Sequence, residues 1–512
     1  MKKTLSFIMV LLILTTVFSA CSQNGNNSSS VAENTISEDA SDDTSSETSE
    51  KTYVADIPEK DYEGLEIKIL TRLTNFGLKG YTEFGFGEEL EANAINTAVA
   101  NRNAAVEELL NIKITEVGII DDSGMATGQM MNEVRQAAAS GQDDYYIIAP
   151  QLYQVAILAS EGLFYNLYDF EYLHDLSAEW WDQNFIKETS IADKAFFAIG
   201  DIGFFAKNSL TVCYFNKNMF EEYDLPDPYE LVKQNKWTLD QVISWSKLVK
   251  SDLDNDQVIN YKDKFGVGGQ NDMMWAMFYG CGETLAEKDV NGMPIVDVYN
   301  TRSVKVMSKI LELMNDKNYF VCANDYWNEP GYTVSPSELI TNAFMTNRCL
   351  LYFESLNIVE DLRNMEASID FGILPVPMYD ENQGGYYHLV NPWGGNAFAI
   401  PQYIGAEKAE IASIVMEALG AAGKNIVTPA YYDVALKKQK TRDNDSQEML
   451  DLIFSTISVD VGHIYNWGNM GFSLLHAMIG SDEGKFTTLW QSMETSVQAA
   501  VEQTVDAFEQ IP

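Results

Sequence analysis

Cysteine and histidine are scarce in this chain of 512 residues, which has five cysteines and four histidines. Apart from Cys21, the cysteines stand singly in apolar surroundings and none has the CxxC spacing of a zinc site or a redox pair. We therefore expect buried free thiols, with a disulfide between Cys281 and Cys322 as the weaker alternative. The small number of histidines and the lack of an HExxH motif argue against a histidine metal site.

Basic residues are also few. The chain has 34 lysines and arginines against 75 acidic residues, a formal net charge of -41. A field of this sign repels phosphate backbones, which excludes nucleic acid as a partner. Residues 437–442 form the one basic cluster that follows the N-terminal segment, and we expect a solvated helix end there. An anionic ligand would need a local basic pocket, and the sequence gives no sign of one.

The length and the apolar content indicate a large folded protein. Hydrophobic residues make up 46% of the chain and aromatic residues 12%, as in well-buried globular proteins. Because 512 residues exceed what a single core usually fills, two domains are expected.

The N-terminal segment has the pattern of an export signal. Lys2 and Lys3 precede an apolar stretch at 5–18, which is short for a membrane span, and small residues follow at 19–20. We predict a signal peptide over 1–20. The position of Cys21 directly after it resembles the lipobox of bacterial lipoproteins, in which this cysteine is acylated and becomes the mature N-terminus, although Phe18 replaces the usual Leu or Val. Ordinary secretion with an incidental cysteine is the alternative.

Residues 22–50 contain no lysine, arginine or aromatic residue and are rich in serine, threonine, asparagine and acidic residues. Such a stretch buries too little apolar surface to offset its ordering entropy. We therefore predict that 21–60 comprise the lipidated cysteine and a disordered linker, which would hold the folded part at the outer face of the cytoplasmic membrane.

Strand and helix patterns alternate after the linker. Strands are predicted at 65–71, 112–117 and 145–149, with helices beginning near Asn93 and spanning 130–140, where Gly141 gives a stop signal. This alternation is typical of a parallel, doubly wound α/β sheet, in which ligands bind at the carboxyl ends of the strands.

The stretch 211–268 carries the most informative order of elements. A buried strand ends in Tyr214-Phe215-Asn216-Lys217, a short helix and a proline turn follow, and Trp237-Thr238 opens an amphipathic helix. This order resembles the extracellular solute-binding proteins of ABC importers, in particular the class that binds sugars and oligosaccharides. An ordinary strand-turn-helix unit of another α/β protein is the alternative.

The resemblance implies a two-lobed, periplasmic-binding-protein-like fold (type II) with two α/β domains joined by a hinge of three crossings. We expect 61–200 and 337–388 to form lobe 1, and 201–336 and 389–512 to form lobe 2. The expected partners are a carbohydrate ligand, a transmembrane permease of an ABC transporter and, through the N-terminal lipid, the membrane. A monomer that needs no cofactor is expected.

The resemblance also places residues from distant segments in the cleft between the lobes. Aromatic faces bind the apolar C–H faces of sugars, and carboxylates and amides bind their hydroxyl groups. The predicted ligand-binding residues are Asp201, Trp275, Glu354, Tyr386, Trp393, Asn396 and Trp467. For the aromatic members a place in the core is the competing interpretation. Gly394 and Gly395 beside Trp393 are expected to let a ligand approach the backbone.

An acidic loop at 252–263 has the spacing of an EF-hand-like calcium site. Oxygen-bearing side chains occupy positions one, three, five, nine and twelve, namely Asp252, Asp254, Asp256, Asn260 and Asp263. The loop departs from the pattern at Gln257, where glycine is usual, and at position twelve, where glutamate is usual. A structural calcium ion and a solvated acidic turn both remain open.

The sequence therefore favours a binding protein that is not an enzyme. A secreted carbohydrate-active hydrolase with paired carboxylates is one alternative, and a peptide-binding protein of the same fold is another. No nucleophile elbow or metal-ligand triad is present to support catalysis.

Overall fold

The computed structural model describes residues 51–76, 80–85, 93–124, 127–364, 369–436 and 444–511. A compact unit begins at Thr52 and is described by itself below. The predicted signal peptide, Cys21, the linker through residue 50 and the basic cluster at 437–442 lie outside the described residues.

Three parallel strands form the first sheet, in the order β2–β1–β3. The strands are β1 (Leu65–Leu73), β2 (Ile112–Ile120) and β3 (Tyr145–Ala149), and the helices between them are α1 (Ala94–Leu110) and α2 (Gln129–Ser140). Asn93 caps α1 by accepting a hydrogen bond from the backbone N–H of Asn96. Gly141 ends α2 in the left-handed conformation, at φ 67°. The predicted βαβ pattern at the start of the domain is confirmed.

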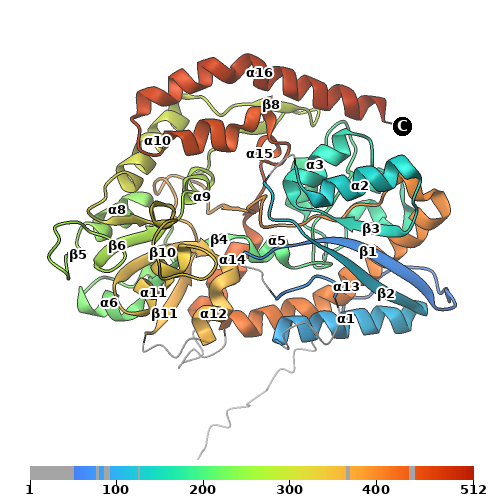
Figure 1. Cartoon of the computed structure of the whole chain (residues 1–512), viewed down its shortest axis with the longest axis horizontal. Coiled ribbons are helices and arrows are strands. Elements are labelled where there is room, and N and C mark those ends of the chain that lie inside the picture. Colours follow the sequence, from blue (N-terminus) through green and yellow to red (C-terminus); the bar gives the residue numbers. More distant parts are fainter. Residues whose placement is uncertain are drawn as a thin grey trace, which may run out of the picture. The chain divides into compact units, whose positions relative to one another are not determined.

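Later segments extend this sheet. Ala399 pairs with Ile148 of β3, and Phe398 pairs with Ala198, both antiparallel. The following helix α13 (Ala406–Leu436) packs on α1 and β3, and Figure 1 shows α13 and α1 side by side. By length and composition α13 could cross a membrane, but most of its apolar stretch is buried within the protein, as in a core helix.

The second sheet is mixed, in the order β11–β4–β10–β6–β5, with β9 paired to β6. Its strands are β4 (Thr211–Asn216), β5 (Lys250–Ser251), β6 (Lys264–Gly269), β9 (Phe320–Cys322), β10 (Cys349–Ser355) and β11 (Phe371–Leu374). β4 is almost wholly buried, as its run of apolar and aromatic residues predicts. It lies antiparallel to both β10 and β11, whereas β10 and β6 are parallel.

Short helices surround the second sheet. They are α6 (Lys217–Glu222), α7 (Pro228–Lys233), α8 (Leu239–Ser246), α9 (Met273–Gly280), α10 (Thr301–Met314), α11 (Ser337–Met345) and α12 (Val359–Asn364). The side chain of Asn216 caps α6, and Pro228 occupies the first turn of α7, where its missing N–H has no cost. Thr238 occupies the predicted N-cap position of α8, but its side chain makes no capping hydrogen bond.

The remaining elements connect and cover the two sheets. Strand pairs β7 (Ala286–Lys288) with β8 (Pro294–Val296) and β12 (His388–Leu389) with β13 (Ile457–Ser458) form two small sheets. The other α-helices are α3 (Leu152–Ser160), α4 (Gln183–Thr189), α5 (Phe205–Asn208), α14 (Asn444–Ser455), α15 (Val461–Ile464) and α16 (Glu483–Gln510). The long helix α16 contacts both α10 and α3 (Figure 1).

The chain passes three times between the two sheets. It leaves the first sheet after Ala198 and enters the second at β4, then returns between Val390 and Asn396, which pairs with Gln151. It passes again after α13, because α14 contacts β11. These passages agree with the predicted fold of two α/β lobes.

The division of the chain between the sheets differs from the predicted lobes in two places. β10 and β11, within 337–388, pair with β4 and so belong with the second sheet, not with residues 61–200. Residues 396–436, predicted in lobe 2, join the first sheet through the pairing of Ala399 and the packing of α13. Hydrophobic periodicity predicts a strand but not its partner, which explains the difference.

The cysteines of the folded unit are buried and free, as predicted. They are Cys213, Cys281, Cys322 and Cys349. The alternative of a Cys281–Cys322 disulfide is therefore wrong. Burial raises the pKa of the Cys322 thiol to about 11, which keeps it protonated and unreactive at neutral pH.

His388 joins the second sheet to the segment that follows α14. Its Nε2 accepts a hydrogen bond from the backbone N–H of Val376 (3.1 Å), so the neutral ring carries its proton on Nδ1, which donates to Oγ1 of Thr456 (2.9 Å). The ring is fully buried, and burial lowers the pKa of His388 to about 3. Protonation of Nε2 would abolish the bond from Val376.

We expect His388 to make the protein less stable in acid. The pKa of an unfolded histidine is about 6.5. The stabilisation by the neutral ring is therefore complete above this pH and is lost as the pH falls toward about 3. The loss is about 1.4 kcal/mol per pH unit between these limits. Urea unfolding of the wild type and His388→Gln at pH 7.5, 6.0 and 5.0 measures it. The free energy of unfolding of the variant should fall less steeply with decreasing pH than that of the wild type, by about 1.4 kcal/mol per pH unit. Parallel dependences on pH in the two proteins would contradict the assignment.

Candidate functional site

A cavity of about 910 Å³ lies between segments of the two sheets. One wall comprises Asn75 and Phe76 beyond β1, together with Tyr81 and Asn93. The other walls come from the residues after β6, the end of β10, the segment 327–342 and the passage at 391–394. The cavity thus lies at the carboxyl ends of β1, β6 and β10, where open α/β sheets bind their ligands. Its volume is near the upper end of the ~300–1,000 Å³ of small-molecule sites.

Aromatic and neutral polar side chains dominate the wall. The aromatic ones are Phe76, Tyr81, Trp327, Phe353 and Trp393. The amides are Asn75, Asn93, Gln270, Asn342, Asn357 and Asn391, and the hydroxyl groups come from Ser209, Thr211, Thr333, Ser335, Ser337, Thr341 and Ser355. The carboxylates are Asp272, Glu338, Glu354 and Asp361. This wall offers flat apolar faces together with many donors and acceptors of hydrogen bonds.

Trp393 is a predicted site residue that lines the cavity. The guanidinium of the buried Arg72 stacks over its ring, 4.6 Å from the centroid, and Phe76 meets the ring edge to face at 5.9 Å. Arg72 is itself held by a hydrogen bond from its Nε to the carbonyl oxygen of Asp121 (2.9 Å). The half-buried Trp393 ring is therefore fixed from behind and offers a preformed face to a ligand.

The two glycines after Trp393 lie in close contact with other parts of the protein, and Gly394 also lines the cavity. A Cβ on Gly394 would lie 2.8 Å from Cβ of Ser209, and one on Gly395 would lie 3.3 Å from Cα of Ala206. These glycines let the return passage pack closely against the first passage. The approach of a ligand to their backbone stays a prediction.

Glu354 also lines the cavity, at the end of β10. Its carboxylate accepts hydrogen bonds from Nε2 of Gln270 (2.7 Å), the backbone N–H of Ser355 (2.9 Å) and the hydroxyl of Tyr352 (3.3 Å). Only 7% of the residue is exposed, and burial raises its pKa despite these bonds. Glu354 therefore holds the side chains of Gln270 and Tyr352 in place in addition to lining the cavity.

Asp272 was not predicted, and it lines the cavity close to Glu354. It precedes α9, and 41% of its side chain is exposed. Oδ2 accepts a hydrogen bond from Nδ2 of Asn391 (3.2 Å), and Nε2 of His476 lies 3.5 Å from Oδ1. Loss of hydration raises the pKa of Asp272 to about 6, and the charge of Glu354 adds to the rise.

The other five predicted residues do not line this cavity. Each is buried and bonded within the protein: Asp201 to Lys207, Lys424 and Thr428, Trp275 to the carbonyl of Gly471, Tyr386 to the carbonyl of Val232, Asn396 to the carbonyl of Arg72, and Trp467 to the hydroxyl of Thr504. The competing interpretation, a place in the core, describes the three aromatic residues. Burial alone would raise the pKa of Asp201, but the charges of Lys207 and Lys424 hold this pKa below its usual value.

Local sequence patterns do not identify most of the other wall residues. Trp327 is the clearest omission, because 49% of it is exposed and it lies beside the cavity in a connecting segment. A tryptophan in a polar, glycine- and proline-containing stretch after a short strand is the signal that could have identified it. Asp272 had a weaker signal, as a polar residue at the start of an apolar helix.

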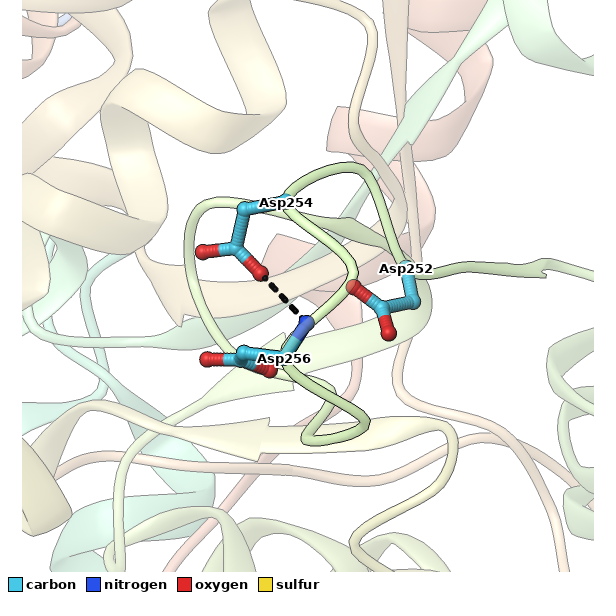
Figure 2. Close-up of side chains that lie close together, drawn as sticks. All are labelled: Asp252, Asp254 and Asp256. Atoms are coloured by element: carbon cyan, nitrogen blue, oxygen red, sulfur yellow. Dashed lines mark hydrogen bonds between the residues drawn. The ribbon is translucent and has the colours of Figure 1, made fainter.

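The acidic loop brings together three of its five predicted metal ligands, as Figure 2 shows. Asp252, Asp254 and Asp256 each place one carboxylate oxygen within 4.8 Å of the others. Asp254 accepts a hydrogen bond from the backbone N–H of Asp256 (3.2 Å), drawn as the dashed line in Figure 2. Gln257, which stands where glycine is usual, has the left-handed φ of 69° that the turn requires.

The other two predicted ligands are bonded to the backbone of the loop. The buried Asp263 accepts hydrogen bonds from the backbone N–H groups of Leu253 (2.8 Å) and Asn260 (3.0 Å), while Oδ1 of Asn260 accepts one from Lys262 (2.9 Å). Asp263 is not part of the carboxylate cluster. Calcium binding by this loop stays a prediction.

Two α/β sheets, a threefold chain passage and a polar, aromatic cavity between them define a two-lobed binding-protein fold. Residues 119–414 match the family model of the bacterial extracellular solute-binding proteins. The chain belongs to this family. A comparison with curated protein sequences finds no match.

Solved structures share the fold at low sequence identity. An ABC substrate-binding protein from Listeria monocytogenes in complex with cycloalternan has a TM-score of 0.51 at 10% identity, over 87% of this chain and 99% of that chain. UgpB from Mycobacterium tuberculosis in complex with glycerophosphocholine has a TM-score of 0.53 at 12% identity, over 86% and 99%. MalE3 from T. maritima with bound maltose has a TM-score of 0.50 at 11% identity, over 86% and 99%. The predicted periplasmic-binding-protein-like fold is confirmed.

Proposed function

We propose that this protein captures a sugar or oligosaccharide by closure of its two lobes and delivers it uncleaved to the permease of an ABC transporter. The observation that carries the proposal is the cavity, whose wall combines aromatic faces with amides and hydroxyl groups from both sheets. Sugars present apolar C–H faces and rings of hydroxyl groups, and this wall suits both. Structures of the same fold hold cycloalternan and maltose.

The contacts between the passages support lobe closure as the means of capture. Leu210 pairs with Val390, and the N–H of Leu356 donates to the carbonyl of Leu210 (2.9 Å). A rotation about these few residues would bring Phe76 and Tyr81 toward Trp327 and Glu354 on the opposite wall. Contacts from both walls would then exist only in the closed state, which the ligand stabilises.

We propose binding without catalysis. The family is one of solute-binding proteins, and a captured ligand needs no nucleophile. A hydrolase would use a pair of carboxylates, for which Asp272 and Glu354 are the candidates in this cavity. Incubation with oligosaccharides followed by product analysis separates the two functions. A peptide ligand is the remaining alternative and belongs in the same binding panel.

The anchoring of the protein is a further part of the proposal. The basic residues, apolar stretch and small residues before Cys21 support export, acylation of Cys21 and attachment to the outer face of the cytoplasmic membrane. A monomer anchored through Cys21 would remain close to its permease in the membrane.

Trp393→Ala should weaken binding of the oligosaccharide that gives the largest thermal shift in a panel of mono- and oligosaccharides. Removal of the stacking face should raise the Kd about tenfold or more. Trp327→Ala should act in the same direction without unfolding the protein, because 49% of Trp327 is exposed. Isothermal titration calorimetry measures both.

Tyr387→Ala is the control, since this exposed tyrosine does not line the cavity. Its Kd should equal that of the wild type. Unchanged affinity in both tryptophan variants would remove the cavity from consideration as the ligand site, and product formation from any oligosaccharide would replace capture by hydrolysis.

We propose, separately, that the acidic loop holds a structural calcium ion through Asp252, Asp254 and Asp256. Three carboxylates supply the hard oxygen ligands that calcium prefers, and a bound cation would relieve their mutual repulsion. The ion would stabilise the loop between β5 and β6 without taking part in sugar binding.

Calcium should therefore raise the melting temperature relative to a sample in EDTA, by mass action on the folded form. Replacement of Asp254 and Asp256 together by Asn should abolish the shift, whereas magnesium should produce a smaller one in the wild type. An identical melting temperature in EDTA and in millimolar calcium would mean that the loop is a solvated acidic turn.

A further inference from the structure

The cavity wall carries negative charge that no cation of the wall balances. Its charged residues, among those the structure describes, are Asp272, Glu338, Glu354 and Asp361, and no lysine, arginine or histidine lines it. Glu338 is occupied by the backbone N–H groups of Thr333 (3.0 Å) and Val334 (2.8 Å). Glu354 is buried and hydrogen-bonded, and Asp361 is exposed on α12. Asp272 lies close to Glu354, has an exposed face and accepts a side-chain hydrogen bond from a single neutral donor, Asn391.

The groups packed around Asp272 do not supply a positive charge at neutral pH. His476 lies 3.5 Å away, but its ring stacks on Trp275 at 4.1 Å, and burial lowers its pKa to about 4. The other facing groups are the carboxylate of Glu354 and the hydroxyl of Tyr153, whose pKa burial raises well above its usual value. A neutral imidazole, a neutral phenol and a second carboxylate therefore surround Asp272.

Arg72 is the cation that packs against the wall, but it does not line the cavity. Its guanidinium lies against the ring of Trp393, its Nε is bonded to the backbone of Asp121, and the carboxylates of Asp121 and Asp122 are close enough to favour its charged form. The positive charge of Arg72 therefore supports the ring of Trp393 and does not balance the carboxylates of the wall.

We propose that the ligand of this cavity carries a protonated amine that binds against Asp272, beside Glu354. The inference rests on the proposed function, since it specifies the class of sugar as an amino sugar or an amine-bearing oligosaccharide. An ammonium group would donate charge-assisted hydrogen bonds to Asp272 and relieve its repulsion with Glu354. Uronic acids and sugar phosphates would instead add a negative charge to a wall of carboxylates and be rejected.

Matched trisaccharides test the proposal. The probes are maltotriose and cellotriose, each in three forms: unmodified, with an amine in place of every C6 hydroxyl, and with every C6 oxidised to a carboxylate. Calorimetry at pH 7.5 and low salt should give the amine form a Kd about tenfold or more below that of the neutral form, as charge-assisted bonds allow. The carboxylate form should bind at least as much more weakly.

Asp272→Asn identifies the residue responsible. The variant should bind the amine and the neutral forms with similar Kd values, and a circular dichroism spectrum and melting temperature like those of the wild type would show that the fold is intact. Asp240→Asn is the matched control, because Asp240 is exposed, pairs with Lys309 and lies outside the cavity. It should keep the full preference for the amine.

The pH dependence provides an independent readout. Protonation of Asp272 as the pH falls through about 6 should remove the preference for the amine form, while His476 stays neutral over this range. Equal affinity for amine and neutral forms in the wild type, or a preference for the carboxylate form, would overturn the inference and leave sugar capture standing. Failure of every probe to bind at any pH would overturn both.

Discussion

Leu210, Leu356 and Val390 form a buried junction at which the first passage, the end of β10 and the return passage meet. All three residues are fully buried, Leu210 pairs with Val390, and the N–H of Leu356 donates to the carbonyl of Leu210. The residues next to them in the chain line the cavity: Ser209, Thr211, Ser355, Asn357 and Asn391. The segments that place these apolar residues in the core thus place their polar neighbours at the cavity.

The same junction fixes the aromatic wall. Trp393 follows Val390 by three residues, and close packing at Gly394 and Gly395 holds the return passage against the first one. Asn396, predicted to contact ligand, instead donates from Nδ2 to the carbonyl of Arg72 (2.9 Å), at the end of β1. The guanidinium of Arg72 supports the Trp393 ring. The side-chain amide of Asn396 therefore affects the site indirectly, because it holds the backbone of Arg72.

Local patterns predicted the elements well and their assembly only in part. The strands and helices of residues 65–149 follow from hydrophobic periodicity and end signals, and the family resemblance led to the correct fold. The lobe assignment differed because the antiparallel pairing of β4 with β10 joins residues far apart in the chain, and no local signal determines it.

The site was harder to predict for a related reason. The local sequence does not distinguish Trp275, Tyr386 and Trp467 from Trp393. Each of the three nevertheless directs its polar atom to a partner within the core. Whether an aromatic ring is buried depends on segments that are distant in the sequence, and local sequence patterns do not predict where those segments pack. Glu354 was predictable because it lies at the end of a strand that the family resemblance places beside the cleft. Asp272, in contrast, lies at the start of a helix, and Trp327 lies in a connecting segment.

The C-terminal segment restricts how the proposed closure can occur. Tyr153 of α3 meets Nε2 of His463 in α15 (2.6 Å), and the rings of Phe196 and Phe508 are 4.7 Å apart, so this segment is attached to the first sheet's side. Near its other end, Tyr299 bonds to Thr487 of α16 (2.8 Å), beside α10. A helix of 28 residues that is attached at both ends resists separation of the two sides. Closure about the Leu210 junction must therefore either turn the lobes around α16 with these contacts kept or break the buried contacts at one end. Rotation with the contacts kept costs less, because a broken contact at Tyr153 or Phe508 would leave buried polar and aromatic groups without partners.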